Sequence, residues 1–274
     1  MGASPKDIYS VDYGAHPYFR IAGRPIFLQQ VTANALDTIE AEQSGTAEGD
    51  KGDAGSEVQV EHTERTSLVV WDCSLVLAKY LEYQRQAIPL HAKRVLELGS
   101  GQGIVGIAAA LLGAQVTLTD VAFAIPALTS VVRLNNLSPV PGSRLAPSDT
   151  AGCVTHVRPL DWLHRDDFIH SLESPFDYIL ASDVVWVDWL IEPLVATIAD
   201  ILQQSHILDA DVHTVAYLCH QTRSTRGDER LFKQLELHGL TYQTVDFNSM
   251  EPTFRKPGLI NIFRVTRAIA DKSP

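Results

Sequence analysis

Apolar positions along this 274-residue chain change their spacing in a regular way from residue 94 onward. Short apolar runs, typical of buried strands, alternate with segments whose apolar residues recur every three or four positions, as on one face of a helix. The predicted strands are RVLEL (94–98), QVTLTD (115–120), CVTHVRPLDW (153–162), FDYILASDVV (176–185), TVAYLCH (214–220), LTYQTVDF (240–247) and INIFRVTR (260–267). The predicted helices cover residues 69–84, 103–112, 124–136, 190–203 and 228–239.

Alternation of strands and helices is typical of an α/β fold in which crossover helices join parallel strands. Gly113 and Gly239 stand at the ends of two of the helical segments, where glycine commonly ends a helix. The pattern predicts a Rossmann-like, doubly wound sheet of seven strands. Its last two strands, 240–247 and 260–267, are expected to close the sheet as an antiparallel hairpin.

The N-terminal part of the chain follows a different pattern. Residues 18–32 alternate around the turn Ala22-Gly23-Arg24-Pro25, which predicts a β-hairpin. Residues 35–65 are rich in Gly, Glu, Asp and Ser, and they almost lack large apolar side chains. Because such a segment buries too little surface to offset its ordering entropy, we expect a mobile acidic loop there. The chain is thus divided into an N-terminal extension, residues 1–65, and one main domain, residues 66–268.

Composition narrows the class of partner and the compartment. A net charge of −11 argues against nucleic acid, and no apolar run is long enough to span a bilayer. The three cysteines are far apart without a C-x-x-C pair, and the N-terminus lacks the apolar core of a signal peptide. We therefore expect a reduced, monomeric protein of the cytoplasm, with the nucleus as a second compartment. The ten histidines lack the spacing of metal ligands, so no metal site is predicted.

Candidate chemistry begins in the stretch VLELGSGQGIVG, residues 95–106. Its glycines permit a tight strand-to-helix turn and a close approach of the backbone to a ligand. Asp120 ends the next predicted strand, where a carboxylate suits two neighbouring ribose hydroxyls. Both NAD and S-adenosylmethionine carry such a ribose, and the G-x-G-x-x-G pattern at Gly101, Gly103 and Gly106 fits either cofactor.

Glu97 is the residue that distinguishes NAD from S-adenosylmethionine as the expected cofactor. It lies near the C-terminal end of the first strand, at the bend expected to hold the ligand. A carboxylate about 4 Å from a phosphate costs about 4 kcal/mol at an effective dielectric constant of 20. S-adenosylmethionine carries no phosphate, but an ammonium and a sulfonium, which a carboxylate would favour. The stretch therefore favours S-adenosylmethionine, and Gly106 is then expected to serve the packing of helix against sheet.

With these residues in place, the chain resembles the seven-strand protein-lysine methyltransferases that use S-adenosylmethionine. The resemblance is closest to the group that modifies Hsp70-type chaperones, the AAA ATPase valosin-containing protein and other non-histone targets. The residues that carry it, over most of residues 66–265, are VVWDCSLVLAKYLE, RVLELGSGQGIVGIAAALLGAQVTLTD, LDW at 160–162, FDYILASDVVW at 176–186 and, more weakly, DERLFKQLELHG. The resemblance implies transfer of methyl groups to a lysine side chain of another protein.

Particular roles follow for residues at the matching positions. Trp162 would lie near the adenine, Asp120 at the ribose, and Ala181 against the cofactor at the end of the fourth strand. From the glycine stretch and the resemblance together, the expected cofactor contacts are Trp71, Glu97, Gly99, Ser100, Gly101, Gly103, Asp120, Trp162 and Ala181. Without the resemblance, Trp71 and Trp162 would be read as ordinary core aromatics.

The resemblance places Asp183 and Trp186 beside the reactive methyl group. Asp183 begins the family's D-x-x-aromatic motif and would orient the amine and hold the incoming ammonium. The family usually ends this motif with Tyr or Phe, so Trp186 is a departure that bears on the width of the amine channel. The alternative is that Asp183 only caps the next helix. Residues 223–229 are expected to cap the helix that follows them, with substrate contact as the lesser alternative.

Two other functions fit the same cofactor-binding half. A small-molecule methyltransferase would share it entirely, and a closed pocket instead of an open groove beside Asp183 would favour that function. A non-catalytic interaction protein would bind S-adenosylmethionine without transferring its methyl group.

Overall fold

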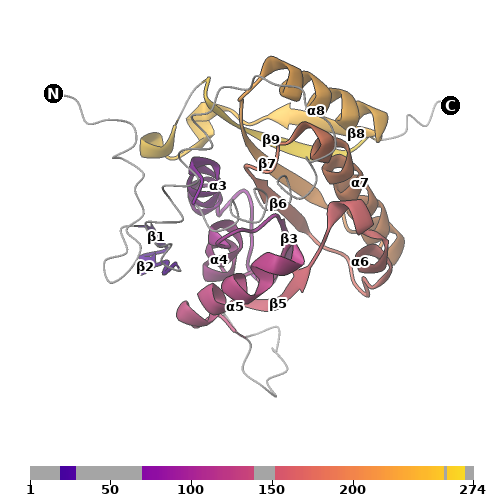
Figure 1. The fold of residues 1–274 in the computed structure, drawn as a ribbon. Helices are drawn as coiled ribbons and strands as arrows, with labels where there is room; N and C mark the ends of the chain where they lie inside the picture. The colour runs from indigo at the N-terminus through magenta and orange to yellow at the C-terminus, as the bar shows by residue number, and fades with distance from the viewer. Residues whose placement is uncertain (1–18, 29–69, 139–151, 256–257, 269–274) are drawn as a thin grey trace.

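A computed structural model describes residues 19–28, 70–138, 152–255 and 258–268 of the chain (Figure 1). One sheet of seven strands lies at its centre, in the order β5-β4-β3-β6-β7-β9-β8. These strands are β3 (Arg94–Leu98), β4 (Gln115–Asp120), β5 (Cys153–Pro159), β6 (Tyr178–Ser182), β7 (Val215–Gln221), β8 (Leu240–Thr244) and β9 (Ile260–Arg267). The predicted doubly wound, seven-strand sheet is confirmed.

The strand order reverses at the centre of the sheet. The chain runs outward from β3 through β4 to β5, then returns to place β6 on the other side of β3. The strands from β3 to β7 are parallel, and β9 lies antiparallel to both β7 and β8, which confirms the predicted closing hairpin. In such sheets a ligand binds outside the carboxyl ends of the strands at the reversal, here beyond β3 and β6.

Helices cover both faces of the sheet (Figure 1). The helices are α3 (Asp72–Tyr83), α4 (Ile104–Leu111), α5 (Ile125–Leu134), α6 (Asp166–His170), α7 (Ile191–Leu208) and α8 (Thr225–Leu237). The first three pack in one layer and the last three in the other, and each layer buries its own apolar cluster against the sheet. None of the helices in the described ranges is long and apolar enough to cross a membrane.

The strand β3 shows how the sequence pattern builds the two layers. Val95 faces the cluster beneath α4, whereas Leu96 and Leu98 face the cluster beneath α7. Successive side chains of a strand point to opposite faces, so Glu97 must share the α4 side with Val95. This alternation decides the surroundings of Glu97.

The predicted elements differ from the observed ones mainly at their ends. Helix α7 continues to Leu208, five residues beyond the predicted end at 203, and α6 was not predicted. The third predicted strand ran to residue 162, but β5 stops at Pro159. Asp161 then caps the short 3₁₀ helix η3 (Trp162–His164), because its side chain accepts a hydrogen bond from the Leu163 amide.

The N-terminal hairpin exists but is smaller than predicted, and it packs against α3. Its strands are β1 (Arg20–Ile21) and β2 (Arg24–Pro25). Two residues of α3 hold the hairpin. Lys79 Nζ donates a hydrogen bond to the Arg20 carbonyl at 2.6 Å, and Glu82 Oε1 accepts one from the Ala22 amide at 2.6 Å. Residues 19, 21, 26 and 28 are buried in the same cluster as α3, so the hairpin packs on the domain that was expected to begin at residue 66. The predicted acidic loop, residues 35–65, lies outside the described residues.

Candidate active site

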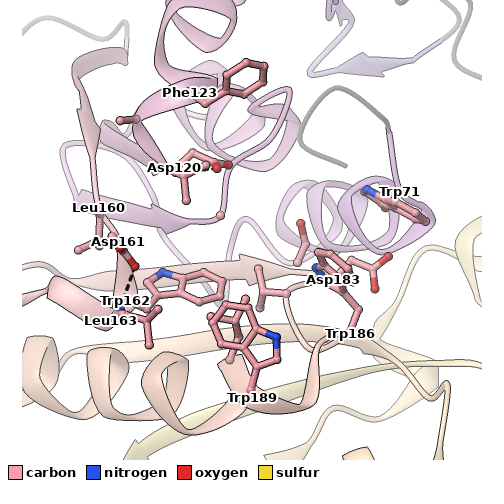
Figure 2. A pocket seen from close by; sticks show the side chains of 16 residues that line it. Trp71, Asp120, Phe123, Leu160, Asp161, Trp162, Leu163, Asp183, Trp186 and Trp189 are labelled. Carbon is pink, nitrogen blue, oxygen red and sulfur yellow. Dashed lines mark hydrogen bonds between the residues drawn. The ribbon is translucent and has the colours of Figure 1, made fainter. Parts of the chain in front are cut away.

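A cavity of about 340 Å³ opens at the carboxyl ends of the central strands, where the strand order reverses. All four tryptophans of the chain line it, namely Trp71, Trp162, Trp186 and Trp189. Figure 2 shows Asp120 and Phe123 toward one end of the cavity and Trp71, Asp183 and Trp186 toward the other. Residues far apart in the sequence thus converge on one cavity of mainly aromatic and apolar lining with a few carboxylates, a form common to cofactor sites.

Asp120 stands at the end of β4 and is held by the glycine turn. Its Oδ2 accepts a hydrogen bond from the Gly101 amide at 2.7 Å, and its Oδ1 accepts one from the Val121 amide at 2.8 Å. Burial raises the pKa of Asp120, and these two amides work against that rise. Each carboxylate oxygen can accept a further bond, so the pair can receive two vicinal hydroxyls of a ribose.

Gly99 brings the backbone close to an aromatic ring of the cavity. A side chain at this position would place its Cβ 2.8 Å from Val184 Cγ1 and 3.3 Å from Trp162 Cζ2. Its φ of +60° also lies in the left-handed region that glycine adopts without strain. The turn after β3 therefore requires glycine, both for its backbone conformation and for the room that the ring of Trp162 occupies.

Glu97 was predicted to lie beside the ligand, but the structure buries it away from the cavity. Its side chain is only 1% exposed and does not line the cavity, because the strand alternation directs it beneath α4. There, Oε2 accepts a hydrogen bond of 2.9 Å from the Gly106 amide. Burial raises the pKa of Glu97 to about 8, so the carboxyl is mostly protonated at neutral pH. A neutral group inside the core offers no charge to a ligand outside the strand.

Gly106 confirms the packing role that was expected of it. A Cβ there would lie 2.2 Å from Leu118 Cδ2 and 2.6 Å from Glu97 Oε2. Helix α4 can approach β3 and β4 this closely only over glycine. The apparent dinucleotide pattern is thus explained by packing at its third glycine.

Some of the other expected cofactor residues line the cavity or the hollow next to it, whereas others are buried in the core. Ser100 lines a small adjoining hollow of about 30 Å³ together with Trp71, Gly99 and Ser182. Gly101 contributes its amide to Asp120, whereas Gly103 turns toward α5, where a Cβ would lie 2.7 Å from Leu128 Cδ1. Ala181 is buried in the cluster beneath α7, and the residue after it, Ser182, lines the cavity in its place. The expected contact of Ala181 with the cofactor stays a prediction.

Asp183 lies at the predicted end of the cavity, but its carboxylate is already paired. Arg223, after β7, donates from Nη1 to Asp183 Oδ1 at 2.5 Å and from Nη2 to Oδ2 at 2.8 Å. The Asp183 side chain is 2% exposed, and the guanidinium also lies 5.5 Å from the centre of the Trp71 ring. The carboxylate that was expected to hold the incoming ammonium is thus paired, in this structure, with a permanent cation that contacts both of its oxygens.

The backbone around Asp183 excludes its other proposed role. The φ of Asp183 is +57°, and its amide donates to the Cys219 carbonyl at 2.9 Å. The next helical turn, η4 (Asp188–Leu190), has Val187 at its N-cap position. Asp183 therefore caps no helix, and its left-handed turn is one that aspartate tolerates better than most residues.

Sequence reasoning missed Trp189 and Phe123, and it assigned Arg223 to a helix cap, with substrate contact only as the lesser alternative. Trp189 is 41% exposed and stands between Trp162 and Trp186 in the close view (Figure 2). Its signal was the spacing of three residues from Trp186. For Arg223 the signal was its place after β7, since β6 and β7 are parallel neighbours whose carboxyl ends meet at one edge. The predicted cap beyond it is confirmed, because Ser224 Oγ accepts from the Gly227 amide at 3.0 Å.

This arrangement is suited to binding an adenosine-like ligand beside a polar reaction centre. Aromatic rings and Asp120 meet the needs of adenine and ribose, while Asp183, Arg223 and Trp186 lie at the far end. Within the described ranges, no group of three or more His, Cys, Asp or Glu side chains could hold a metal ion.

Comparison with known proteins identifies the family of the chain. A family model described as lysine methyltransferase matches residues 53–238. The protein N-lysine methyltransferase METTL21A of Xenopus tropicalis is 39% identical over 142 residues, which are 51% of this chain and 57% of that protein. METTL21A of Danio rerio is 33% identical over 205 residues, 75% of this chain and 78% of that protein. EEF1A lysine methyltransferase 3 of Mus musculus is 31% identical over 166 residues, 61% of this chain and 60% of that protein.

The matches to the Xenopus and Mus relatives thus span less than two thirds of either protein, whereas the match to the Danio relative spans more than three quarters of it. Because the family model covers well over half of the chain and includes every cavity residue discussed above, this protein belongs to the lysine methyltransferase family.

Proposed function

We propose that this protein transfers a methyl group from S-adenosylmethionine to the ε-amine of a lysine in another protein. The observation that carries the proposal is the convergence of Asp120, Trp162, Asp183 and Trp186 on one cavity in a chain of this family. When bound, S-adenosylmethionine supplies a methyl group already activated on a sulfonium sulfur.

The cavity residues fit this cofactor. Asp120 and Trp162 both line the cavity, where Asp120 would accept the ribose hydroxyls and the ring of Trp162 would offer a flat apolar surface for adenine. Gly99 lets that ring and Val184 pack close to the turn after β3, because a Cβ at this position would lie 3.3 Å from Trp162 Cζ2 and 2.8 Å from Val184 Cγ1. The aromatic faces of Trp71 and Trp186 favour a cationic centre at the other end of the cavity.

The chain's contribution to catalysis would be alignment and exclusion of water. A free lysine has a pKa near 10.4 and must lose its proton before its nitrogen can attack. Trp186 would wall the channel through which the amine enters, and the buried end of the cavity would strip water from it. Such positioning can account for much of the acceleration when the donor is intrinsically reactive.

The mouth of the cavity favours a protein substrate over a small molecule. Trp189 and Leu163 line the cavity and remain well exposed, so the cavity opens to solvent where a substrate surface could approach. On the resemblance of the sequence, we infer that the substrate is a chaperone or AAA ATPase. We further infer that the protein acts as a monomer in the cytoplasm, with the nucleus as a second compartment. The three cysteines, all free and buried, support a reducing compartment.

The proposal is tested by incubating the purified protein with methyl-tritiated S-adenosylmethionine and a cell protein extract. The expected result is label in one or a few proteins, on the ε-nitrogen of lysine when digests are analysed by mass spectrometry. Asp120→Asn should reduce the labelling, and Arg226→Gln, an exposed substitution beside the site, should not. Label confined to the small-molecule fraction would favour the small-molecule enzyme. Cofactor binding without any transfer would favour the interaction protein.

A further inference from the structure

The loop after β7 holds Arg223 against Asp183, and hydrogen bonds to α8 fix the conformation of this loop. His220 Nε2 lies 2.6 Å from Asp228 Oδ1, and Thr222 Oγ1 donates to Asp228 Oδ2 at 2.8 Å. Ser224 caps the same first turn of α8. The residues on both sides of Arg223 are thus tied to α8, so its guanidinium is directed at Asp183 by the framework of the loop.

Arg223 and Asp183 form an ion pair at one end of the cavity. The Arg223 side chain is 34% exposed, while that of Asp183 is almost fully buried. Burial by itself would lower the pKa of Arg223, but the hydrogen bonds and charge of Asp183 outweigh it, and the pKa is raised. Arginine stays charged at any physiological pH, so this end of the cavity holds one anion and one permanent cation in contact.

An unpaired Asp183 would work against methyl transfer. A buried carboxylate near a lysine favours the charged ammonium, and an opposite charge within about 4–6 Å shifts a pKa by about 1–3 units. The ammonium has no lone pair with which to attack. The guanidinium removes this effect, because the amine then meets a pair of no net charge.

We propose that Arg223 is a positioning residue that cancels the charge of Asp183, so that the target lysine is held as a neutral amine. This inference rests on the proposed function. In the step it serves, the nitrogen lone pair forms the new N–C bond, the C–S electron pair stays on sulfur, and the amine proton has passed to solvent beforehand. Asp183 then orients the amine as a hydrogen-bond acceptor without stabilising its protonated form.

The other titratable groups around the pair come from four elements. Cys73 of α3 and Cys219 of β7 are buried thiols, and the pKa of Cys73 is raised by its contact with Cys219 and by burial, which keeps it uncharged. His220 of β7 and Asp228 of α8 pair with each other. Asp188 of η4 faces Arg226 of α8, with 3.9 Å between Oδ2 and Nε.

The first test measures how tightly the site binds a cation, and it does not require methyl transfer. Proteins loaded with S-adenosylhomocysteine are titrated with n-butylamine at pH 8.5, where this alkylamine, like lysine with its pKa near 10.4, is still a cation. Tryptophan fluorescence reports binding, because every tryptophan of the chain lines the cavity. We expect Arg223→Gln to bind the cation at least tenfold more tightly than wild type, while Arg223→Lys and the control Arg226→Gln stay near wild type. Equal affinity of Arg223→Gln and wild type would overturn the proposal.

The second test is the pH profile of labelling of the extract protein. For Arg223→Gln the rising limb of the transfer rate should move to higher pH by about one unit or more. Arg223→Lys should move it less, and Asp183→Asn, which leaves the guanidinium without a charge to balance it, should move it to lower pH. These opposite signs keep the test decisive if one variant does not fold, as checked by its melting and its affinity for S-adenosylhomocysteine. A rate that falls equally at every pH would make Arg223 merely structural. If wild type labels no protein, the proposed function fails, and the butylamine titration still decides the role of Arg223.

Discussion

The carboxyl of Glu97 lies beneath helix α4, where Oε2 accepts a hydrogen bond of 2.9 Å from the Gly106 amide. Burial raises its pKa from an ordinary 4.5 to about 8. The folded chain therefore keeps this proton over a pH range in which the unfolded chain has lost it. By linkage, the stability associated with this proton is complete below about pH 4.5 and is lost as the pH rises through about 8.

Glu97→Gln should flatten this pH dependence. Glutamine is neutral at all pH values and can still accept from the Gly106 amide through its carbonyl oxygen. Relative to wild type, the variant should gain about 1 kcal/mol or more per pH unit between pH 5 and 8. Melting temperatures at pH 5, 7 and 9 measure the effect, with Glu236→Gln on the exposed face of α8 as the control. Parallel curves for Glu97→Gln and wild type would contradict the raised pKa.

Gly106→Ala should destabilise the fold although alanine is the better helix former. Helix propensity favours alanine by about 1 kcal/mol. The new Cβ, however, would lie 2.2 Å from Leu118 Cδ2, and overpacking of this kind costs about 1–3 kcal/mol or more. Urea unfolding should show a net loss of stability. As a control, Gly23→Ala has nothing within 4 Å and is strained only by its φ of +76°, so it should cost about 1–2 kcal/mol. A Gly106→Ala protein more stable than wild type would show that α4 shifts freely away from the sheet.

Asp120→Asn should weaken binding of S-adenosylmethionine and S-adenosylhomocysteine. The amide group turns one acceptor oxygen into a donor that would face the Gly101 or Val121 amide or a ribose hydroxyl. The loss should be about 1–3 kcal/mol, which is about 5- to 150-fold in Kd. Calorimetry and quenching of tryptophan fluorescence check the change, and Asp246→Asn, in an exposed turn, serves as the control. Unchanged affinity would remove Asp120 from the site, and tight binding of NAD would contradict the cofactor assignment.

Trp186→Phe should keep methyl transfer and widen the channel. Phenylalanine is the ring that relatives of this sequence are expected to carry, so the rate should stay within about tenfold of wild type, or about 1.4 kcal/mol. The smaller ring leaves more room around the nitrogen, so more methyl groups should be added per lysine. Mass spectrometry of the modified peptide counts them, with unchanged S-adenosylhomocysteine affinity as the check on folding. A product distribution identical to that of wild type would show that Trp186 does not set the width of the channel.

The sequence by itself determined the architecture and most of the cavity. Apolar periodicity located all seven strands, because strand and helix spacing differ and parallel strands need helices between them. Trp71, Gly99, Asp120, Trp162, Asp183 and Trp186 were found from their places at strand ends and from family resemblance, and all of them line the cavity. Strand ends are informative because the carboxyl edge of a parallel sheet gathers residues that are distant in the chain.

Only the tertiary structure decided which charges face the ligand and which face one another. Glu97 seemed to belong to the site by its position in the strand, but the alternation of side chains and the close approach of α4 over Gly106 bury it as a neutral acid. Asp183 seemed free to bind an amine, until Arg223, 40 residues later, was found on its carboxylate. Electrostatic interactions depend on distance and burial, and neither quantity is present in a linear sequence.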